Sequence, residues 1–325
     1  MRSLLLIFVA LVSVAAVAAD AGGRPARAPS LTFKQVTLDG KRRVLSRHTF
    51  DPYVVSLSPD HRELAYIAQP AVGVRDNPVL VADVRTARER VLADTGCQSS
   101  GVSWAPNGQV LALIASAGAF CTEGGLWFVN PDGSGFHRVD RAPGLVWSPD
   151  SKSLAGSRPV SILSLATGEE RVLSAGHSPA WSPDGSRIAF VHNTPSDLQV
   201  LGVASVRTGA VQDYTRANSS SPVWSPDGSR IAFIRFVRDA YHLELWVTSS
   251  RKRNPRRLAR GLAPTTPFVW SPKGRQIAYV RGATLFARRL DGRVGRFLAY
   301  ENGAAITPLA WSRDGRRVLY FTLAR

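Results

Sequence analysis

A ten-residue phrase, WSPDGSRIAF, occurs twice without change, at residues 181–190 and 224–233. Five further segments keep its pattern of an apolar lead-in, a Ser-Pro-Asp-Gly-like turn and an apolar exit. The residues aligned with the Pro of the phrase are Pro59, Pro106, Pro149, Pro183, Pro226, Pro272 and Arg313. Successive copies are about 42 residues apart, a period typical of β-propeller blades and longer than ankyrin or tetratricopeptide repeats. The phrase is therefore interpreted as a building unit of the fold, since a catalytic motif normally occurs once.

Each copy predicts a β-hairpin. Pro presets φ at the second turn position, Asp suits the third, and Gly accepts the left-handed geometry that follows. Six of the eight tryptophans occupy one slot just before the turn: Trp104, Trp147, Trp181, Trp224, Trp270 and Trp311. Leu57 takes this slot in the first copy. A large apolar side chain at one fixed site per repeat is what packing between neighbouring blades requires.

A second, looser hairpin recurs between the copies, for example at residues 79–94, 126–140 and 161–174. We name the strands of the phrase A and B, and those of the looser hairpin C and D. One extra C–D hairpin, residues 31–46, precedes the first phrase, and the last phrase has no C–D hairpin after it. Pairing these two ends predicts an all-β fold, a seven-bladed propeller of four-stranded blades over residues 31–325. A six-bladed ring is the alternative if the weak first repeat is irregular.

The first 19 residues differ in composition from the rest. Arg2 is followed by an uncharged, apolar stretch that ends in small residues, which predicts a secretory signal peptide over residues 1–19, with an uncleaved membrane anchor as the alternative. Residues 20–30 are expected to form a flexible lead-in. We therefore expect an extracytoplasmic protein, secreted or periplasmic. In that oxidising environment the two cysteines, Cys97 and Cys121, are candidates for a disulfide, with two free thiols as the alternative.

The repeated Trp-Ser-Pro-Asp-Gly followed by Ser-Arg-Ile-Ala-Phe resembles the TolB-type β-propeller repeat, a WD40-like repeat. The resemblance covers nearly the whole of the expected mature chain and implies the propeller fold. Members of this group bind a peptidoglycan-associated lipoprotein, precede a hydrolase domain in prolyl oligopeptidase-type enzymes, or carry a metal site in polysaccharide lyases. The propeller fills this chain, which leaves no room for the TolB N-terminal domain or for a hydrolase domain. The resemblance therefore implies a free-standing propeller and does not determine its function.

Few motifs indicate catalysis. The chain has no Gly-x-Ser-x-Gly, phosphate-binding loop, Cys-x-x-Cys or His-Glu-x-x-His motif, and Gly176–Ala180 (GHSPA) lacks the last Gly of a nucleophile elbow. Five Asp residues recur in the phrase, namely Asp60, Asp150, Asp184, Asp227 and Asp314, and are interpreted as turn residues rather than metal ligands. We expect no cofactor and no metal. A non-catalytic role is favoured over the alternative of a carbohydrate lyase or hydrolase.

In a propeller, the D–A and B–C loops emerge together on one face. On this rim the sequence places Arg47, His48, Asp51, His177, His192, Arg235, Arg238 and Arg281. Polar loop residues on a rigid scaffold suit binding. The preferred hypothesis is a scaffold that binds a protein or peptide there, and ordinary solvated loops are the alternative.

The net charge of +17 suggests an anionic partner, although a compositional bias toward Arg would also explain it. The densest basic run lies in one C–D turn and contains Arg251, Lys252, Arg253, Arg256 and Arg257. It suits phosphate or another polyanion. No aromatic residues interleave with it to stack bases, and export argues against a nucleic-acid target. The second hypothesis is therefore a cell-envelope module that holds an anionic polymer through Arg-rich turns.

Overall fold

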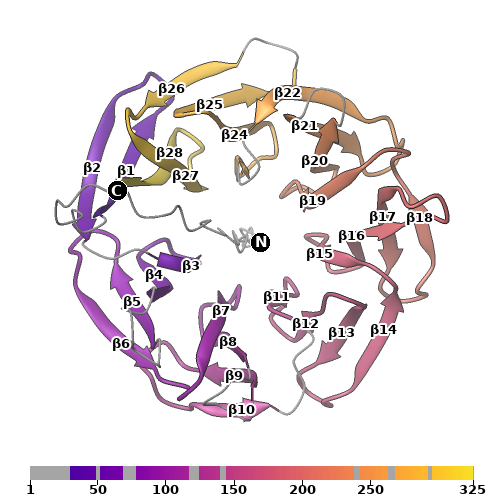
Figure 1. The fold of residues 1–325 in the computed structure, drawn as a ribbon, viewed down its shortest axis with the longest axis horizontal. Helices are drawn as coiled ribbons and strands as arrows, with labels where there is room; N and C mark the ends of the chain where they lie inside the picture. Colours follow the sequence, from indigo (N-terminus) through magenta and orange to yellow (C-terminus); the bar gives the residue numbers. More distant parts are fainter. Residues whose placement is uncertain are drawn as a thin grey trace, which may run out of the picture.

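The computed structural model describes residues 30–48, 52–68, 78–116, 124–139, 144–237, 242–262, 268–291 and 295–324. These residues form 28 β-strands and no helix. The strands build seven four-stranded antiparallel sheets arranged as a ring, with the A strands nearest the axis and the D strands at the perimeter (Figure 1). Within the described ranges no helix is long and apolar enough to cross a membrane.

We number the blades along the chain. Blade 1 contains β3 (Pro52–Leu57), β4 (Glu63–Ala68), β5 (Val79–Asp83) and β6 (Glu89–Ala93). Blade 2 contains β7 (Gln98–Trp104), β8 (Leu111–Ser116), β9 (Gly125–Val129) and β10 (His137–Val139). Blade 3 contains β11 (Val146–Trp147), β12 (Ser153–Ala155), β13 (Val160–Ser164) and β14 (Glu170–Ser174). Blade 4 contains β15 (His177–Trp181), β16 (Arg187–Asn193), β17 (Gln199–Ser205) and β18 (Val211–Asp213).

Blade 5 contains β19 (Ser219–Trp224), β20 (Arg230–Val237), β21 (His242–Ser249) and β22 (Arg256–Leu262). Blade 6 contains β23 (Phe268–Trp270), β24 (Gln276–Arg281), β25 (Thr284–Arg289) and β26 (Arg296–Tyr300). Blade 7 combines the two ends of the chain, β27 (Ala304–Trp311) and β28 (Arg317–Ala324) with β1 (Ser30–Thr37) and β2 (Arg42–His48). The predicted seven blades and their closure are thus confirmed, and the six-bladed alternative is wrong. The predicted signal peptide and nearly all of the lead-in lie outside the described residues.

The closing blade is held by more than its strand ladder. Strand β1 pairs with β28 along its whole length, from Ser30↔Ala324 to Thr37↔Arg317. The Lys34 ammonium lies 2.6 Å from Glu301 Oε2, and the Tyr320 hydroxyl donates to Glu301 Oε1 at 2.9 Å. Strand β1 is thereby tied both to β28 and to blade 6, because Glu301 directly follows β26.

The A–B turns owe their shape to side chains within the phrase. In blade 4, Ser182 Oγ donates to Asp184 Oδ1 at 2.6 Å and accepts from the Arg187 N–H at 2.9 Å. Gly185, with φ of 71°, occupies the left-handed position that follows. The same Ser–Asp bond recurs at Asp60, Asp150, Asp227 and Asp314. The five aspartates are therefore turn residues, as the sequence predicts.

Packing between blades repeats in the same way. Seven apolar clusters lie one between each pair of neighbouring blades in the described part of the chain. In five interfaces the indole N–H of the recurring Trp donates to a backbone carbonyl of the preceding blade, that of the residue just before the equivalent Trp. Trp224, for example, donates to the Ala180 carbonyl at 3.0 Å. The other donors are Trp147, Trp181, Trp270 and Trp311. The recurring tryptophans thus link blades through both burial and a hydrogen bond.

Candidate anion-binding pocket

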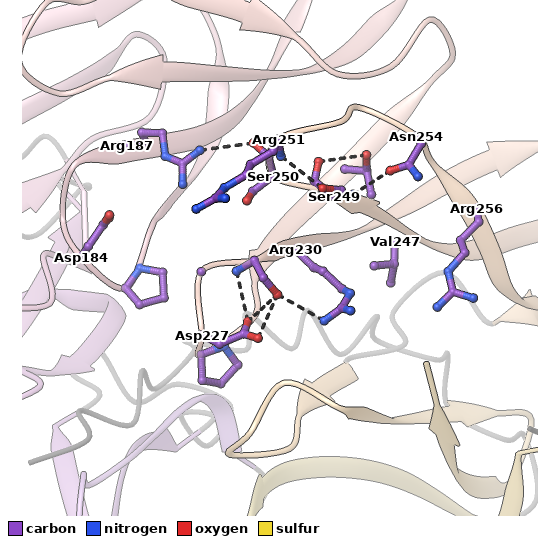
Figure 2. Close-up of a pocket in the computed structure, with 15 residues that line it drawn as sticks. Asp184, Arg187, Asp227, Arg230, Val247, Ser249, Ser250, Arg251, Asn254 and Arg256 are labelled. Atoms are coloured by element: carbon purple, nitrogen blue, oxygen red, sulfur yellow. Dashed lines mark hydrogen bonds between the residues drawn. The ribbon is translucent and has the colours of Figure 1, made fainter. Parts of the chain in front are cut away.

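A cavity of about 860 Å³ lies between blades 4 and 5, on the face formed by the A–B and C–D turns. We call it the Arg pocket because four arginines line it: Arg187, Arg230, Arg251 and Arg256. The other polar residues in its lining are Asp184, Asp227, Ser229, Thr248, Ser249, Ser250 and Asn254. Figure 2 shows these side chains arranged around the space.

Two of the arginines belong to the two identical copies of the phrase. Arg187 begins β16 and Arg230 begins β20, so they occupy the same position in neighbouring blades. The Arg187 guanidinium lies over the ring of Trp224, 4.6 Å from its centroid, and donates to the Ser250 carbonyl at 3.3 Å. Arg230 donates to Ser229 Oγ at 3.2 Å. The repeat thus supplies one wall of the pocket.

The C–D turn of blade 5 supplies a second wall. Ser249 Oγ accepts from the N–H groups of Arg251 and Lys252, both at 3.2 Å, which fixes the start of this turn. Asn254 Oδ1 accepts from the Ser249 N–H at 3.4 Å. Arg256 donates to the carbonyl of Leu290 in blade 6, so its side chain is anchored at one end of the pocket.

The electrostatics of the Arg pocket favour an anion. Among the described residues, no carboxylate lies within 4.0 Å of any of its four guanidiniums. Burial by itself would raise the pKa of Asp184 and Asp227. Hydrogen bonds from Ser and backbone groups of their own turns outweigh this effect, so the pKa of each carboxyl is below its usual value and both are ionised at neutral pH. Four positive and two negative charges leave an excess of positive charge in a concave, partly desolvated site.

One inter-blade contact beside the Arg pocket differs from two of its counterparts. In two other interfaces a strand-D arginine donates to the carbonyl of the first residue after strand C of the next blade. Arg171 bonds to Val206 in this way, and Arg256 bonds to Leu290. Between blades 4 and 5 the corresponding carbonyl is that of Ser250, which accepts from the Tyr214 hydroxyl at 2.7 Å and from Arg187.

Gln212 stands in β18 where the strand-D arginine stands elsewhere. It pairs with Val203, as Arg171 pairs with Ile162 and Arg256 with Val247. The Gln side chain is shorter than that of Arg, and the Ser250 carbonyl accepts from Tyr214 and Arg187. The Ser250 carbonyl that receives these contacts belongs to a residue that lines the Arg pocket.

A second cavity, of about 530 Å³, lies between blades 2 and 3 on the same face. Its lining is mainly apolar and includes Phe128, Val139, Trp147 and Leu163, together with His137. Phe128 contacts both the His137 and Trp147 rings at centroid distances of 5.7 Å. It has no arginine among its lining residues.

The predicted basic run is only partly gathered into the Arg pocket. Arg251 and Arg256 line it, whereas Lys252 and Arg253 are exposed in the same turn. Arg257 turns away and pairs with the buried Glu244 at 2.9 Å. Sequence analysis missed Arg187 and Arg230, although both stand in the identical phrase copies, because the phrase was interpreted as architecture alone.

The predicted rim residues lie in strands more often than in loops. Arg47, His177, His192, Arg235 and Arg281 all belong to strands, and His48 ends β2. The loop placement of these residues is corrected accordingly. Asp51 and Arg238 lie outside the described residues.

The rim side chains mostly contact their own blades. His177 Nδ1 lies 3.0 Å from Ser178 Oγ, and His192 Nε2 lies 2.7 Å from Asp213. Burial, with the nearby positive charge of Arg158, lowers the pKa of His177. Arg235 lies 5.1 Å from the ring centroid of Trp246. Over the described ranges, no three His, Cys, Asp or Glu side chains come close enough together to hold a metal ion.

Cys97 is buried in the D–A connection before β7, as expected. Cys121 lies outside the described residues. The disulfide between them stays a prediction.

Residues 154–325, more than half of the chain, match the family model described as the TolB beta propeller domain. The chain belongs to the TolB β-propeller family. No curated protein matches its sequence.

Similar solved structures include TolB from Acinetobacter baumannii, at 16% identity, TM-score 0.50 and coverage of 70% of this chain and 62% of that one. A TolB-like protein from Agrobacterium tumefaciens, described as putative TolB, aligns at 15% identity and TM-score 0.54 over 91% of this chain and 99% of that one. Oligogalacturonate lyase in complex with manganese aligns at 14% identity and TM-score 0.62 over 91% of each chain. The chain thus spans less than two thirds of the Acinetobacter TolB, and these similarities show the fold alone.

Proposed function

We propose that this TolB-like propeller is an extracytoplasmic, non-catalytic binding module that holds an anionic polymer on the face formed by its A–B and C–D turns. The observation that carries the proposal is the Arg pocket, in which four guanidiniums without a carboxylate partner among the described residues line one cavity. Guanidinium groups suit phosphate and carboxylate because their planar donors match both oxyanions in a bidentate geometry.

The surroundings of the pocket support the same role. The exposed Lys252 and Arg253 extend the positive charge outward along the C–D turn of blade 5. A polymer with one anionic group in the pocket would meet these side chains with its next groups. The chain as a whole carries a formal charge of +17, which favours rapid association with a polyanion.

The binding test uses the expected mature chain, residues 20–325, with poly(glycerol phosphate) and polygalacturonate as anionic polymers and dextran as the neutral one. Affinity is measured over a series of salt concentrations. We expect both anionic polymers to bind and dextran not to bind. The slope of log K against log salt should report the contacts, each contributing about −0.7 to −0.9 for a polyelectrolyte of high charge density.

A charge-matched pair of variants locates the site. Arg230→Gln with Arg251→Gln removes two charges from the Arg pocket, and Arg47→Gln with Arg281→Gln removes two from the opposite rim. The first pair should weaken binding by about tenfold or more, with a shallower salt slope, whereas the second should change it by less than about twofold. Equal losses for the two pairs, or binding to dextran, would refute the proposal. A loss confined to the rim pair would instead support binding of the partner at the D–A and B–C rim.

A further inference from the structure

We propose that the Arg pocket is a selective subsite for an oxyanion carried on a hydroxylated unit, a sugar phosphate or a sugar acid, and not a site for negative charge in general. This inference rests on the proposed function and specifies which anionic ligand the face recognises.

The lining contains hydrogen-bond acceptors as well as cations. Asp184 and Asp227 stand in the A–B turns of the two blades, and both are ionised. An ionised carboxylate has about four acceptor positions, so each retains capacity beyond its contacts within the turn. A ligand hydroxyl can donate to such an oxygen. A bare polyphosphate has no donor to offer it and is repelled by its charge.

The lining also offers neutral polar groups. Ser249 ends β21, and Asn254 lies next to it in the C–D turn (Figure 2), whereas the lining residues Thr248 and Ser250 are buried. Hydroxyl and amide groups both donate and accept, which suits the hydroxyls of a polyol. The cavity volume of about 860 Å³ is within the usual range for small-molecule sites, so a whole ligand unit fits rather than one isolated anionic group.

Aromatic ligands are disfavoured by the same lining. The ring nearest to the arginines is that of Trp224, which is fully buried and lies beneath the Arg187 guanidinium. It presents no face on which a nucleobase could stack, and stacking is a major source of affinity for single-stranded nucleic acid. The recognised unit is therefore hydroxylated and non-aromatic.

The turn chemistry supplies a substitution that separates selectivity from charge. Asn107 occupies the turn position of Asp184 in blade 2, and its Oδ1 accepts from the Gln109 N–H at 2.9 Å as an aspartate would. Asp184→Asn should therefore keep the fold. It removes one negative charge from the Arg pocket, so a ligand recognised by charge alone must bind more tightly to the variant. A ligand whose hydroxyl donates to Asp184 must bind more weakly.

The interface chemistry supplies a second such substitution. Gln212→Arg restores the residue type found at Arg171 and Arg256, and its guanidinium would reach the Ser250 carbonyl at the wall of the pocket. It adds one positive charge and is expected to compete with the lining residue Arg187 for the Ser250 carbonyl, which would displace that side chain. Charge alone predicts tighter binding to this variant, and a shaped pocket predicts weaker binding. Gln109→Arg adds the same charge at an exposed A–B turn of blade 2 and is the matched control.

The experiment is calorimetric titration with glucose 6-phosphate, glucuronate, tripolyphosphate and glucose at one fixed ionic strength. We expect glucose 6-phosphate or glucuronate to bind more tightly than tripolyphosphate, and glucose not to bind; the preferred acid identifies phosphate or carboxylate as the group. Asp184→Asn should weaken the sugar ligand by about fivefold or more and strengthen tripolyphosphate. Gln212→Arg should weaken the sugar ligand by about tenfold, with Gln109→Arg within about twofold of the natural chain.

The inference is overturned if tripolyphosphate binds more tightly than both sugar acids, or if Asp184→Asn and Gln212→Arg strengthen every anion. Urea unfolding of each variant shows whether the fold is kept. Should Asp184→Asn fail to fold, the ligand order and the Gln212→Arg comparison still decide the question. Polymer binding that persists while the sugar acids fail would refute this selectivity and leave the proposed function standing. Loss of all anion binding would refute both.

Discussion

The indole hydrogen bonds between blades predict a measurable difference between two buried tryptophans. Trp311 is 1% exposed, and its Nε1 donates to the Val269 carbonyl at 3.0 Å. Trp104 is 4% exposed, and its Nε1 has no hydrogen-bond partner in the described part of the chain. Replacing either by Phe removes similar apolar volume, which should cost about 1 to 2 kcal/mol in each case. Only Trp311→Phe also leaves a carbonyl without its donor, at a further cost of about 1 to 3 kcal/mol.

The assay is urea unfolding followed by circular dichroism, with the free energy of unfolding extrapolated to water. Both variants should unfold with the slope of the natural protein, so that a shift of midpoint reports stability. We expect Trp311→Phe to be less stable than Trp104→Phe by about 1 to 3 kcal/mol. Equal losses for the two variants would show that the tryptophan slot acts through burial alone and that the indole hydrogen bonds contribute nothing net.

Three further predictions concern stability. Glu301→Gln should lower the free energy of unfolding by about 2 kcal/mol at pH 7, because it breaks the ion pair that ties the closing strand. Burial by itself would raise the pKa of Glu301, but its lysine and tyrosine partners outweigh this effect and hold the pKa below its usual value. The loss of stability in the variant should therefore shrink as pH falls below 4.5. A loss at pH 7 no larger than that of the exposed Glu169→Gln would contradict this prediction. His61, with φ of 64°, stands where other turns have Gly, so His61→Gly should stabilise the protein by about 0.5 to 1 kcal/mol in thermal unfolding at pH 7.5. Burial and a neighbouring arginine lower the pKa of His61, so the natural chain loses stability as pH falls below 6.5. The stabilisation by His61→Gly should therefore be larger at pH 5.5 than at pH 7.5. A destabilised variant would show that packing of the imidazole outweighs backbone strain. Reduction of the predicted Cys97–Cys121 disulfide, which closes a loop of about 25 residues, should cost about 3 kcal/mol, and alkylation of both thiols in the unreduced native protein would rule the disulfide out.

Much of the fold was predictable because its information is local. The Ser–Pro–Asp–Gly turn is stabilised by hydrogen bonds that span at most five residues, as between Ser182 and Arg187. Each copy therefore reports its own hairpin, and counting copies counts blades. The closure of the ring was predictable because the C–D hairpin 31–46 had no A–B hairpin before it and the last A–B phrase had no C–D hairpin after it.

The candidate site was predictable only in part. The basic run identified Arg251 and Arg256 because clustered charge is visible in a linear sequence. The rim histidines and arginines were expected in loops, whereas the structure places most of them in strands and in contact with their own blades. Arg187, for example, packs over Trp224 and also lines the Arg pocket with a half-buried charge, and a repeat pattern reveals only the first of these roles.

The sequence by itself therefore determined the blade, its turns, its tryptophan slot and the number of copies, because each depends on neighbours along the chain. The tertiary structure alone decided where the Arg pocket lies. It brings two equivalent arginines of neighbouring blades, Arg187 and Arg230, to the C–D turn of blade 5, where Arg187 bonds to the Ser250 carbonyl 63 residues away. Those relations arise only when the blades pack into a ring, since packing brings together residues that the period of the repeat keeps apart.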